Sequence, residues 1–137
     1  MAAARSADWR TSLLAFVAEA RHRTLVYGEY DCALFAAEAV RVMTGLDLAA
    51  PFRGRYTTLE GGLRVLRRHG FADHVALARA ELETIAVAAA MPGDLAVFAV
   101  DPVPALGVVQ GAAVYVLGRN GGLGLMPLTE AVEAFRV

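Results

Sequence analysis

The sequence predicts an α+β fold in which N-terminal helices pack on a small C-terminal antiparallel sheet. Before Pro92-Gly93, apolar residues recur mainly with helical spacing, whereas beyond this pair short apolar runs are separated by turn residues. Helices that precede a run of strands joined by short turns are typical of α+β proteins. The 137 residues match the usual size of one domain, so we expect a single unit over residues 1–137.

Two helices are expected in the first third of the chain. Apolar residues from Trp9 to Ala20 recur at the spacing of an amphipathic helix. Asp31 stands at the N-cap position of a second helix, whose apolar face begins at Cys32. Gly45 is placed to end this helix in a left-handed conformation.

A third helix is expected between residues 57 and 70, because Thr57 to Glu60 matches a capping box and Gly70 is suited to end it. The alanine-rich segment 73–91 leaves two alternatives, a helix or a short strand at residues 84–87. Beyond Pro92-Gly93 we expect hairpin turns at Gln110-Gly111 and Asn120-Gly121, and a final helix at residues 129–135. The four expected strands cover residues 94–100, 106–109, 112–117 and 123–126.

The composition excludes several classes of function. The net charge is −1, which argues against a nucleic-acid partner, and all 13 basic residues are Arg, which excludes chemistry that needs lysine. A single Cys makes neither an internal disulfide nor a cysteine-rich zinc site, so we expect no metal and no cofactor. No apolar run approaches the roughly 20 residues that span a bilayer, so we expect no membrane insertion, and we see no signal peptide or anchor.

Cys32 is the candidate reactive residue. It is expected in the first turn of a helix, where free backbone N–H groups and the helix dipole lower the pKa of a thiol. The negative charge of the neighbouring Asp31 raises the pKa of the thiol, and a lone Cys is often simply a buried core residue. The position alone therefore leaves two alternatives, a core residue or a nucleophile.

Two segments resemble the NlpC-type cell-wall peptidases. The run from Tyr27 to Phe35 (YGEYDCALF) is similar to the start of the family's catalytic helix, and Pro92 to Phe98 (PGDLAVF) is similar to its Pro-Gly-Asp-Leu strand, with a later Pro127-Leu128. The resemblance covers roughly residues 9–137. It implies a papain-like fold, with Cys32 at the nucleophile position, Asp31 as the helix cap beside it, and Tyr27 in the same site.

A narrower resemblance points to an uncharacterised subgroup found in phage and prophage tail gene clusters. It rests on Asp-Cys-Ala-Leu-Phe followed by Thr44-Gly45, on residues 52–57 (FRGRYT), and on residues 105–108 (ALGV). The resemblance implies a structural component of the tail, at its tip or hub, with other tail proteins as partners. The implied location is the virion tail, assembled in the cytoplasm of the bacterial host.

The sequence departs from the peptidases at the catalytic base. Where the family has His-Val-Gly-Ile, this chain has Ala105 to Val108, and the next strand offers no polar third member of a triad. The three histidines, His22, His69 and His74, lie outside the expected sheet, and we expect them to be exposed residues at helix ends. His22 is the least improbable substitute, because it precedes Tyr27 by a few residues.

The loop around residues 52–56 has two interpretations. Arg53 and Arg55 flank a glycine between Phe52 and Tyr56, a pattern that suits an acidic ligand or an assembly contact. The structural alternative is that the aromatic residues anchor the loop to the core while the arginines pair with nearby carboxylates or carbonyls, and we favour this alternative.

Three functions follow from these observations. The first is a tail component built on a degenerate NlpC-type fold that has lost hydrolysis, because the base position is Ala105. The second is an active cysteine peptidase that cleaves peptidoglycan stem peptides during cell entry, with Cys32 as nucleophile and a base elsewhere. The third is a module that binds a peptide or cell-wall fragment without turnover.

Overall fold

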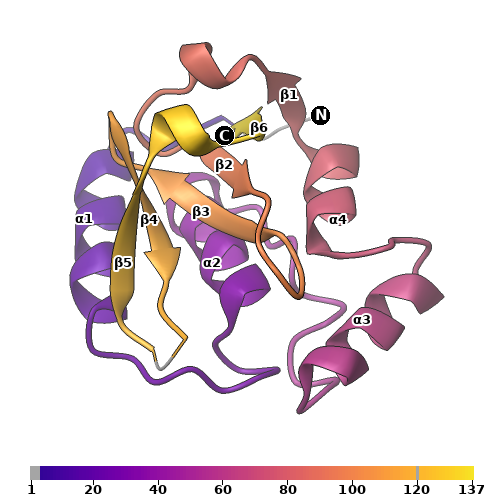
Figure 1. Cartoon of the computed structure of the whole chain (residues 1–137). Helices are drawn as coiled ribbons and strands as arrows, with labels where there is room; N and C mark the ends of the chain where they lie inside the picture. The colour runs from indigo at the N-terminus through magenta and orange to yellow at the C-terminus, as the bar shows by residue number, and fades with distance from the viewer. Residues whose placement is uncertain (1–3, 120) are drawn as a thin grey trace.

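The computed structural model of the chain describes residues 4–119 and 121–137 and has the predicted α+β architecture, with helices preceding most of the sheet (Figure 1). The helices are α1 (Trp9–Ala20), α2 (Cys32–Thr44), α3 (Leu59–Arg68) and α4 (His74–Glu81), with two single-turn 3-10 helices, η1 (Val87–Ala89) and η2 (Leu128–Glu130). The strands are β1 (Glu83–Ile85), β2 (Leu95–Phe98), β3 (Ala105–Val109), β4 (Ala113–Leu117), β5 (Leu123–Pro127) and β6 (Glu133–Arg136).

The six strands form one antiparallel sheet in the order β1-β6-β2-β3-β4-β5. Strands β2 to β5 follow one another as a meander, and the chain then returns so that β6 lies between β1 and β2. Gln110-Gly111 lies in the turn between β3 and β4, as predicted, and the Gln110 N–H donates to the Ala113 carbonyl at 2.8 Å. Of the second predicted turn, Asn120 lies outside the described residues.

One strand of the sheet contradicts the sequence prediction, and another lies in the segment for which two alternatives were left open. Residues 129–135 were expected to form a helix, but Glu133–Arg136 form strand β6, with Ala134 and Phe135 fully buried. Hydrogen bonding to β1 on one side and β2 on the other outweighs the helix propensity of this short segment. The ambiguous segment 73–91 contains both alternatives, because helix α4 is followed directly by strand β1.

The helix ends follow local side-chain chemistry. Asp31 is the N-cap of α2, and its Oδ1 accepts a hydrogen bond from the Leu34 N–H at 3.0 Å. Gly45 ends the same helix with a φ of 82°, which confirms the predicted left-handed residue. The cap of α3 is Thr58, one residue later than predicted, because its hydroxyl and not that of Thr57 accepts from the Gly61 N–H.

Helix α2 lies at the centre of the main hydrophobic core, packed against α1 on one side and against β3 and β4 on the other. Phe35 of α2 is fully buried and stacks on Phe16 of α1, with ring centroids 5.4 Å apart. Burial of a side chain of this size contributes about 1.5–3 kcal/mol relative to exposure. This packing holds the start of α2, and therefore Cys32, in a fixed place relative to the sheet.

The Pro-Gly-Asp motif anchors both ends of the described chain. The buried Asp94 carboxylate accepts hydrogen bonds from the backbone N–H groups of Met91 and Val137 and from the Arg5 guanidinium, each at 2.9 Å. Arg5 also donates to the Val137 carbonyl at 2.7 Å. The motif that resembles the peptidase strand is thus a structural clamp at the edge of the core.

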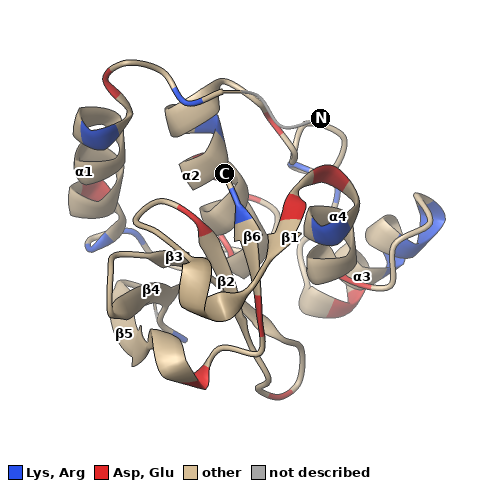
Figure 2. Cartoon of the chain, turned by 90° about the horizontal axis from the view of Figure 1, so that it is seen from above, with Lys and Arg blue, Asp and Glu red and all other residues tan. Residues whose placement is uncertain are grey.

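Charged residues lie on the helices, on the loops and on strands β1 and β6, while β2, β3, β4 and β5 carry none (Figure 2). Each of the four α-helices carries both acidic and basic residues. None of the helices in the described part of the chain combines the length and hydrophobicity needed to cross a bilayer.

Candidate functional site

The turn before Cys32 is built around one buried carboxylate. Asp31 accepts hydrogen bonds from the Gly28 N–H at 3.1 Å, from the Leu34 N–H at 3.0 Å and from the Tyr56 hydroxyl at 2.6 Å. Only 4% of the Asp31 surface is exposed, so these three donors replace its hydration. Asp31 therefore fixes the entry to α2 and sets the direction in which Cys32 projects.

Gly28 is required by the packing of two loops. Its φ is 88°, and an added Cβ would lie 1.9 Å from the carbonyl oxygen of Tyr56. The Gly54 N–H donates to the Gly28 carbonyl at 2.8 Å. The turn at residue 28 and the loop at residues 52–56 therefore form one packed unit beside the start of α2.

A histidine from a second helix start lies next to the thiol. His74 is the first residue of α4, which Asp73 caps by accepting from the Ala76 N–H at 2.9 Å. The His74 Nε2 lies 3.8 Å from the Cys32 Sγ, although the two residues are 42 positions apart in the chain. The prediction that His74 is exposed is wrong, because only 7% of its surface is accessible.

The other two histidines do not take this position. His22, the substitute favoured by the sequence, is exposed at the end of α1. His69 is exposed at the end of α3 and interacts with the Val65 carbonyl of its own helix at 2.9 Å through Nδ1. His74 is therefore the histidine that meets Cys32.

Strand β3 contributes backbone groups to the thiol. The Leu106 N–H lies 3.5 Å from the Cys32 Sγ, and the Leu106 carbonyl oxygen lies 3.9 Å from it. Ala105, at the position where the peptidases have their histidine, is the preceding residue of the same strand and is half-buried. Strand β3 thus reaches the sulfur through its backbone, and the imidazole beside the sulfur comes from α4.

The environment keeps both reactive groups neutral. Burial, assisted by the Asp31 charge and opposed by the hydrogen bond from Leu106, raises the pKa of Cys32 to about 11. Burial lowers the pKa of His74, against the effects of Asp73, Asp31 and a hydrogen bond to the Pro104 carbonyl. The expectation that the helix start lowers the thiol pKa is therefore wrong, because desolvation dominates.

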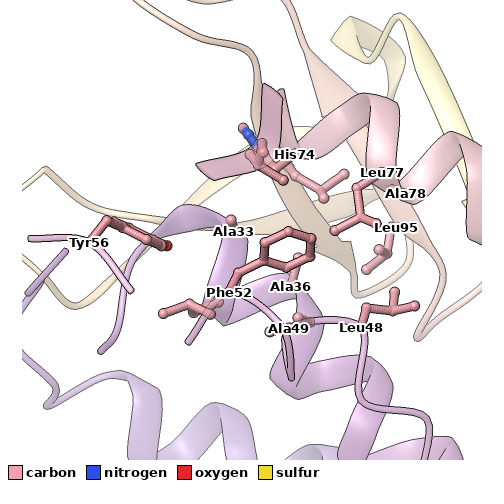
Figure 3. Close-up of a pocket in the computed structure, with 14 residues that line it drawn as sticks. Ala33, Ala36, Leu48, Ala49, Phe52, Tyr56, His74, Leu77, Ala78 and Leu95 are labelled. Carbon is pink, nitrogen blue, oxygen red and sulfur yellow. The ribbon is translucent and has the colours of Figure 1, made fainter. Parts of the chain in front are cut away.

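Two adjoining cavities surround the pair. The first, which we call the thiol cavity, has a volume of about 50 Å³ and is lined by Tyr27, Asp31 and Cys32 together with residues of α3. The second, which we call the apolar cavity, has a volume of about 40 Å³ and is shown in Figure 3. Four residues line both cavities: Ala33, Tyr56, Leu66 and His74.

The loop at residues 52–56 has the packing of the structural alternative. Phe52 is buried and contacts the ring of His69 edge-on, with centroids 4.9 Å apart, while Tyr56 donates to Asp31. Arg53 donates to both carboxylate oxygens of Asp47, at 3.0 and 3.1 Å. Arg55 is exposed. Three of the four residues considered for ligand binding are thus engaged within the chain.

Residues 4–137 match the model of a family described as a domain of unknown function (DUF6950). The chain belongs to this family. The matched range contains Cys32 and His74, so both members of the pair lie within the DUF6950 domain. No curated protein matches the sequence. Within the described residues, no group of three or more His, Cys, Asp or Glu side chains is arranged to hold a metal ion.

Proposed function

We propose that this DUF6950 domain is a cysteine acyl hydrolase with a papain-like, NlpC-type fold, in which Cys32 is the nucleophile and His74 is the base. The observation that carries the proposal is the approach of the His74 Nε2 to the Cys32 Sγ, 3.8 Å apart at the wall of a cavity. A nucleophile with a base near hydrogen-bond reach is the signature of covalent acyl transfer, and such contacts are often long before substrate binds.

The resting pair consists of a thiol and a neutral imidazole, because burial disfavours both charged forms. The reaction therefore begins with proton transfer during attack. As the Cys32 Sγ bonds to the substrate carbonyl carbon, its proton passes to His74 and the carbonyl π electrons move to oxygen. The carbonyl re-forms, the leaving group departs with the proton from His74, and an acyl thioester remains on Cys32.

Water completes the cycle by attacking the thioester carbonyl while His74 accepts its proton. The bond to sulfur breaks, and the proton on His74 returns to the Cys32 sulfur as the acid leaves. At the start of α2, Asp31 occupies the Leu34 N–H. The N–H groups of Cys32 and Ala33 have no carbonyl acceptor within the helix, so these two are available to the developing oxyanion.

The orientation of His74 is supported by the backbone instead of a third polar side chain. The backbone of Pro104 interacts with the imidazole and raises the pKa of His74, as expected where a carbonyl accepts from a ring N–H. We assign this N–H to Nδ1, which leaves Nε2 bare and able to accept the thiol proton. In the peptidases this orienting role belongs to the third, polar member of the triad. Residues 114–117 of this chain offer no such residue, so we assign the role to the Pro104 carbonyl.

The proposal favours the second of the three functions predicted from the sequence. The reason for expecting a degenerate enzyme was that no histidine accompanied Cys32, and His74 removes that reason. The location in a phage tail, the tail partners at the hub or tip, and action on peptidoglycan stay predictions that follow from the resemblance.

Hydrolysis of p-nitrophenyl acetate provides the test, because an activated ester reports acyl transfer without knowledge of the natural substrate. We expect acetylation of Cys32 in the intact-mass spectrum and turnover that Cys32→Ala abolishes. His74→Ala should lower kcat at least about 100-fold, the usual contribution of a general base. The matched control is His22→Ala, which changes an exposed histidine and should leave kcat within twofold.

Two results would contradict the proposal. If Cys32 remains unmodified after prolonged incubation with the ester, Cys32 is excluded as the nucleophile. If His74→Ala is folded and turns over the ester as fast as the wild-type protein, His74 is excluded as the base.

A further inference from the structure

We infer that the acyl group delivered to Cys32 is a short, uncharged, apolar chain, and that it lies in the apolar cavity. This inference rests on the proposed function and names its substrate class. Stem peptides of the cell wall, which the resemblance implies as substrate, carry carboxylates, so this inference competes with the prediction of a peptidoglycan substrate and keeps only the acyl-transfer chemistry at Cys32.

The lining of the apolar cavity contains no group that could compensate a charge. Its walls consist of alanine, leucine and phenylalanine side chains from helices α2, α3 and α4, the sheet and the loop at residues 48–52 (Figure 3). The two other lining residues are Tyr56, whose hydroxyl already donates to Asp31, and His74, whose pKa burial lowers. None of the 13 arginines lines either cavity. A carboxylate placed here would lose its hydration without a partner.

The apolar cavity adjoins the reactive pair. The two cavities share four lining residues: His74, Tyr56, Ala33 and Leu66. Figure 3 shows His74 on one side of the apolar cavity, with Leu77 and Ala78 of the same helix next to it. The inferred acyl chain would run from a carbonyl held at Cys32, past these shared residues, into the apolar cavity.

The volume limits the length of the chain. The volume of about 40 Å³ is a few times the roughly 10–15 Å³ that one enclosed water requires, which suits a short chain of on the order of three heavy atoms. This corresponds to the three carbons beyond the carbonyl of a butyryl group. Longer chains would have to displace the surrounding side chains, which a close-packed interior resists.

The inference is tested by measuring, with NMR on the full chain, how tightly butyramide and succinamate bind. The two amides have similar chains, but succinamate ends in a carboxylate. We expect butyramide to shift the amide resonances of residues around the apolar cavity and succinamate to bind at least tenfold more weakly. In Ala37→Leu, three added carbons enter the cavity from α2, and butyramide should bind at least tenfold more weakly. The matched control is Ala18→Leu on the exposed face of α1, with unchanged binding.

A second filling variant, Leu77→Phe from α4, provides the same comparison if Ala37→Leu fails to fold. The inference is wrong if succinamate binds as tightly as butyramide, or if neither filling variant weakens butyramide. These outcomes are distinct from failure of the proposed function. If esters acylate Cys32 but butyramide and succinamate bind equally well, the inference alone is overturned. If no ester acylates Cys32, the proposed function is overturned.

Discussion

Unfolding the chain in urea should make its only thiol much easier to ionise. In the folded protein, burial and the neighbouring Asp31 raise the pKa of Cys32 to about 11. In the unfolded chain the same thiol should titrate near the ordinary value of about 8.5. Because the chain contains one Cys, the unfolded protein is its own matched control.

The size of the difference follows from these two pKa values. At pH 8.5 about half of the unfolded chains carry a thiolate, whereas a pKa of about 11 leaves roughly 0.3% of the folded chains ionised. The thiolate is the species that alkylating reagents attack. Alkylation at pH 8.5 should therefore be roughly 150-fold slower in the folded protein from ionisation alone, and slower still where the cavity restricts access.

The assay is the rate of carbamidomethylation by iodoacetamide, read by intact mass between pH 7 and 10. For the folded protein, the logarithm of the rate should rise with unit slope over this whole range, while the unfolded chain should level off above pH 9. Circular dichroism at each pH confirms that the folded sample remains folded. A folded-state rate that levels off below pH 8 would refute the reasoning, because it would mean that Cys32 and His74 rest as a thiolate and imidazolium pair.

Three further expectations concern stability, each measured by urea unfolding. Burial lowers the pKa of His74 in the folded protein, so as the pH falls the unfolded chain binds a proton before the folded one does. The free energy of unfolding should therefore decline below about pH 6.5, and His74→Leu should remove part of this decline. An unchanged pH dependence in His74→Leu would contradict this expectation. Tyr56→Phe removes the hydroxyl that donates to Asp31 and should cost about 1.5–3 kcal/mol, whereas no loss would mean that water replaces this bond. Asp94→Ala leaves the Arg5 guanidinium, the buried Val137 N–H and the partly buried Met91 N–H without their acceptor. It should cost about 3–5 kcal/mol, more than Arg5→Ala, and a larger loss in Arg5→Ala would contradict the role of Asp94 as the clamp.

The features that could be predicted from the sequence depend on neighbours in the chain. The Asp31 cap and the left-handed Gly45 follow from local hydrogen bonding and backbone preference, and both are present. The turn at Gln110-Gly111 follows from the same kind of local chemistry. Cys32 was identified as the candidate reactive residue for this reason, since its position at a helix start is encoded by the residues directly before it.

The features that could not be predicted depend on the packing of distant segments. Strand β6 was mistaken for a helix because its pairing with β1 and β2 involves residues far away in the sequence. His74 was missed because its approach to Cys32 joins two helix starts 42 residues apart. One local signal was present, since Asp73-His74 repeats the arrangement of Asp31-Cys32, an aspartate cap followed by a side chain that can react.

The position of Cys32 and His74 as first residues of their helices also has a consequence for motion. Each is held by an aspartate cap, and His74 is nearly enclosed, so neither side chain has much freedom to change the 3.8 Å gap by rotating. The gap is therefore set by the relative position of the starts of α2 and α4. Relative displacement of helices is slower than side-chain rotation and involves many atoms at once. The proposed proton transfer would thus depend on a collective displacement of two helices, so substitutions away from the pair would alter its rate.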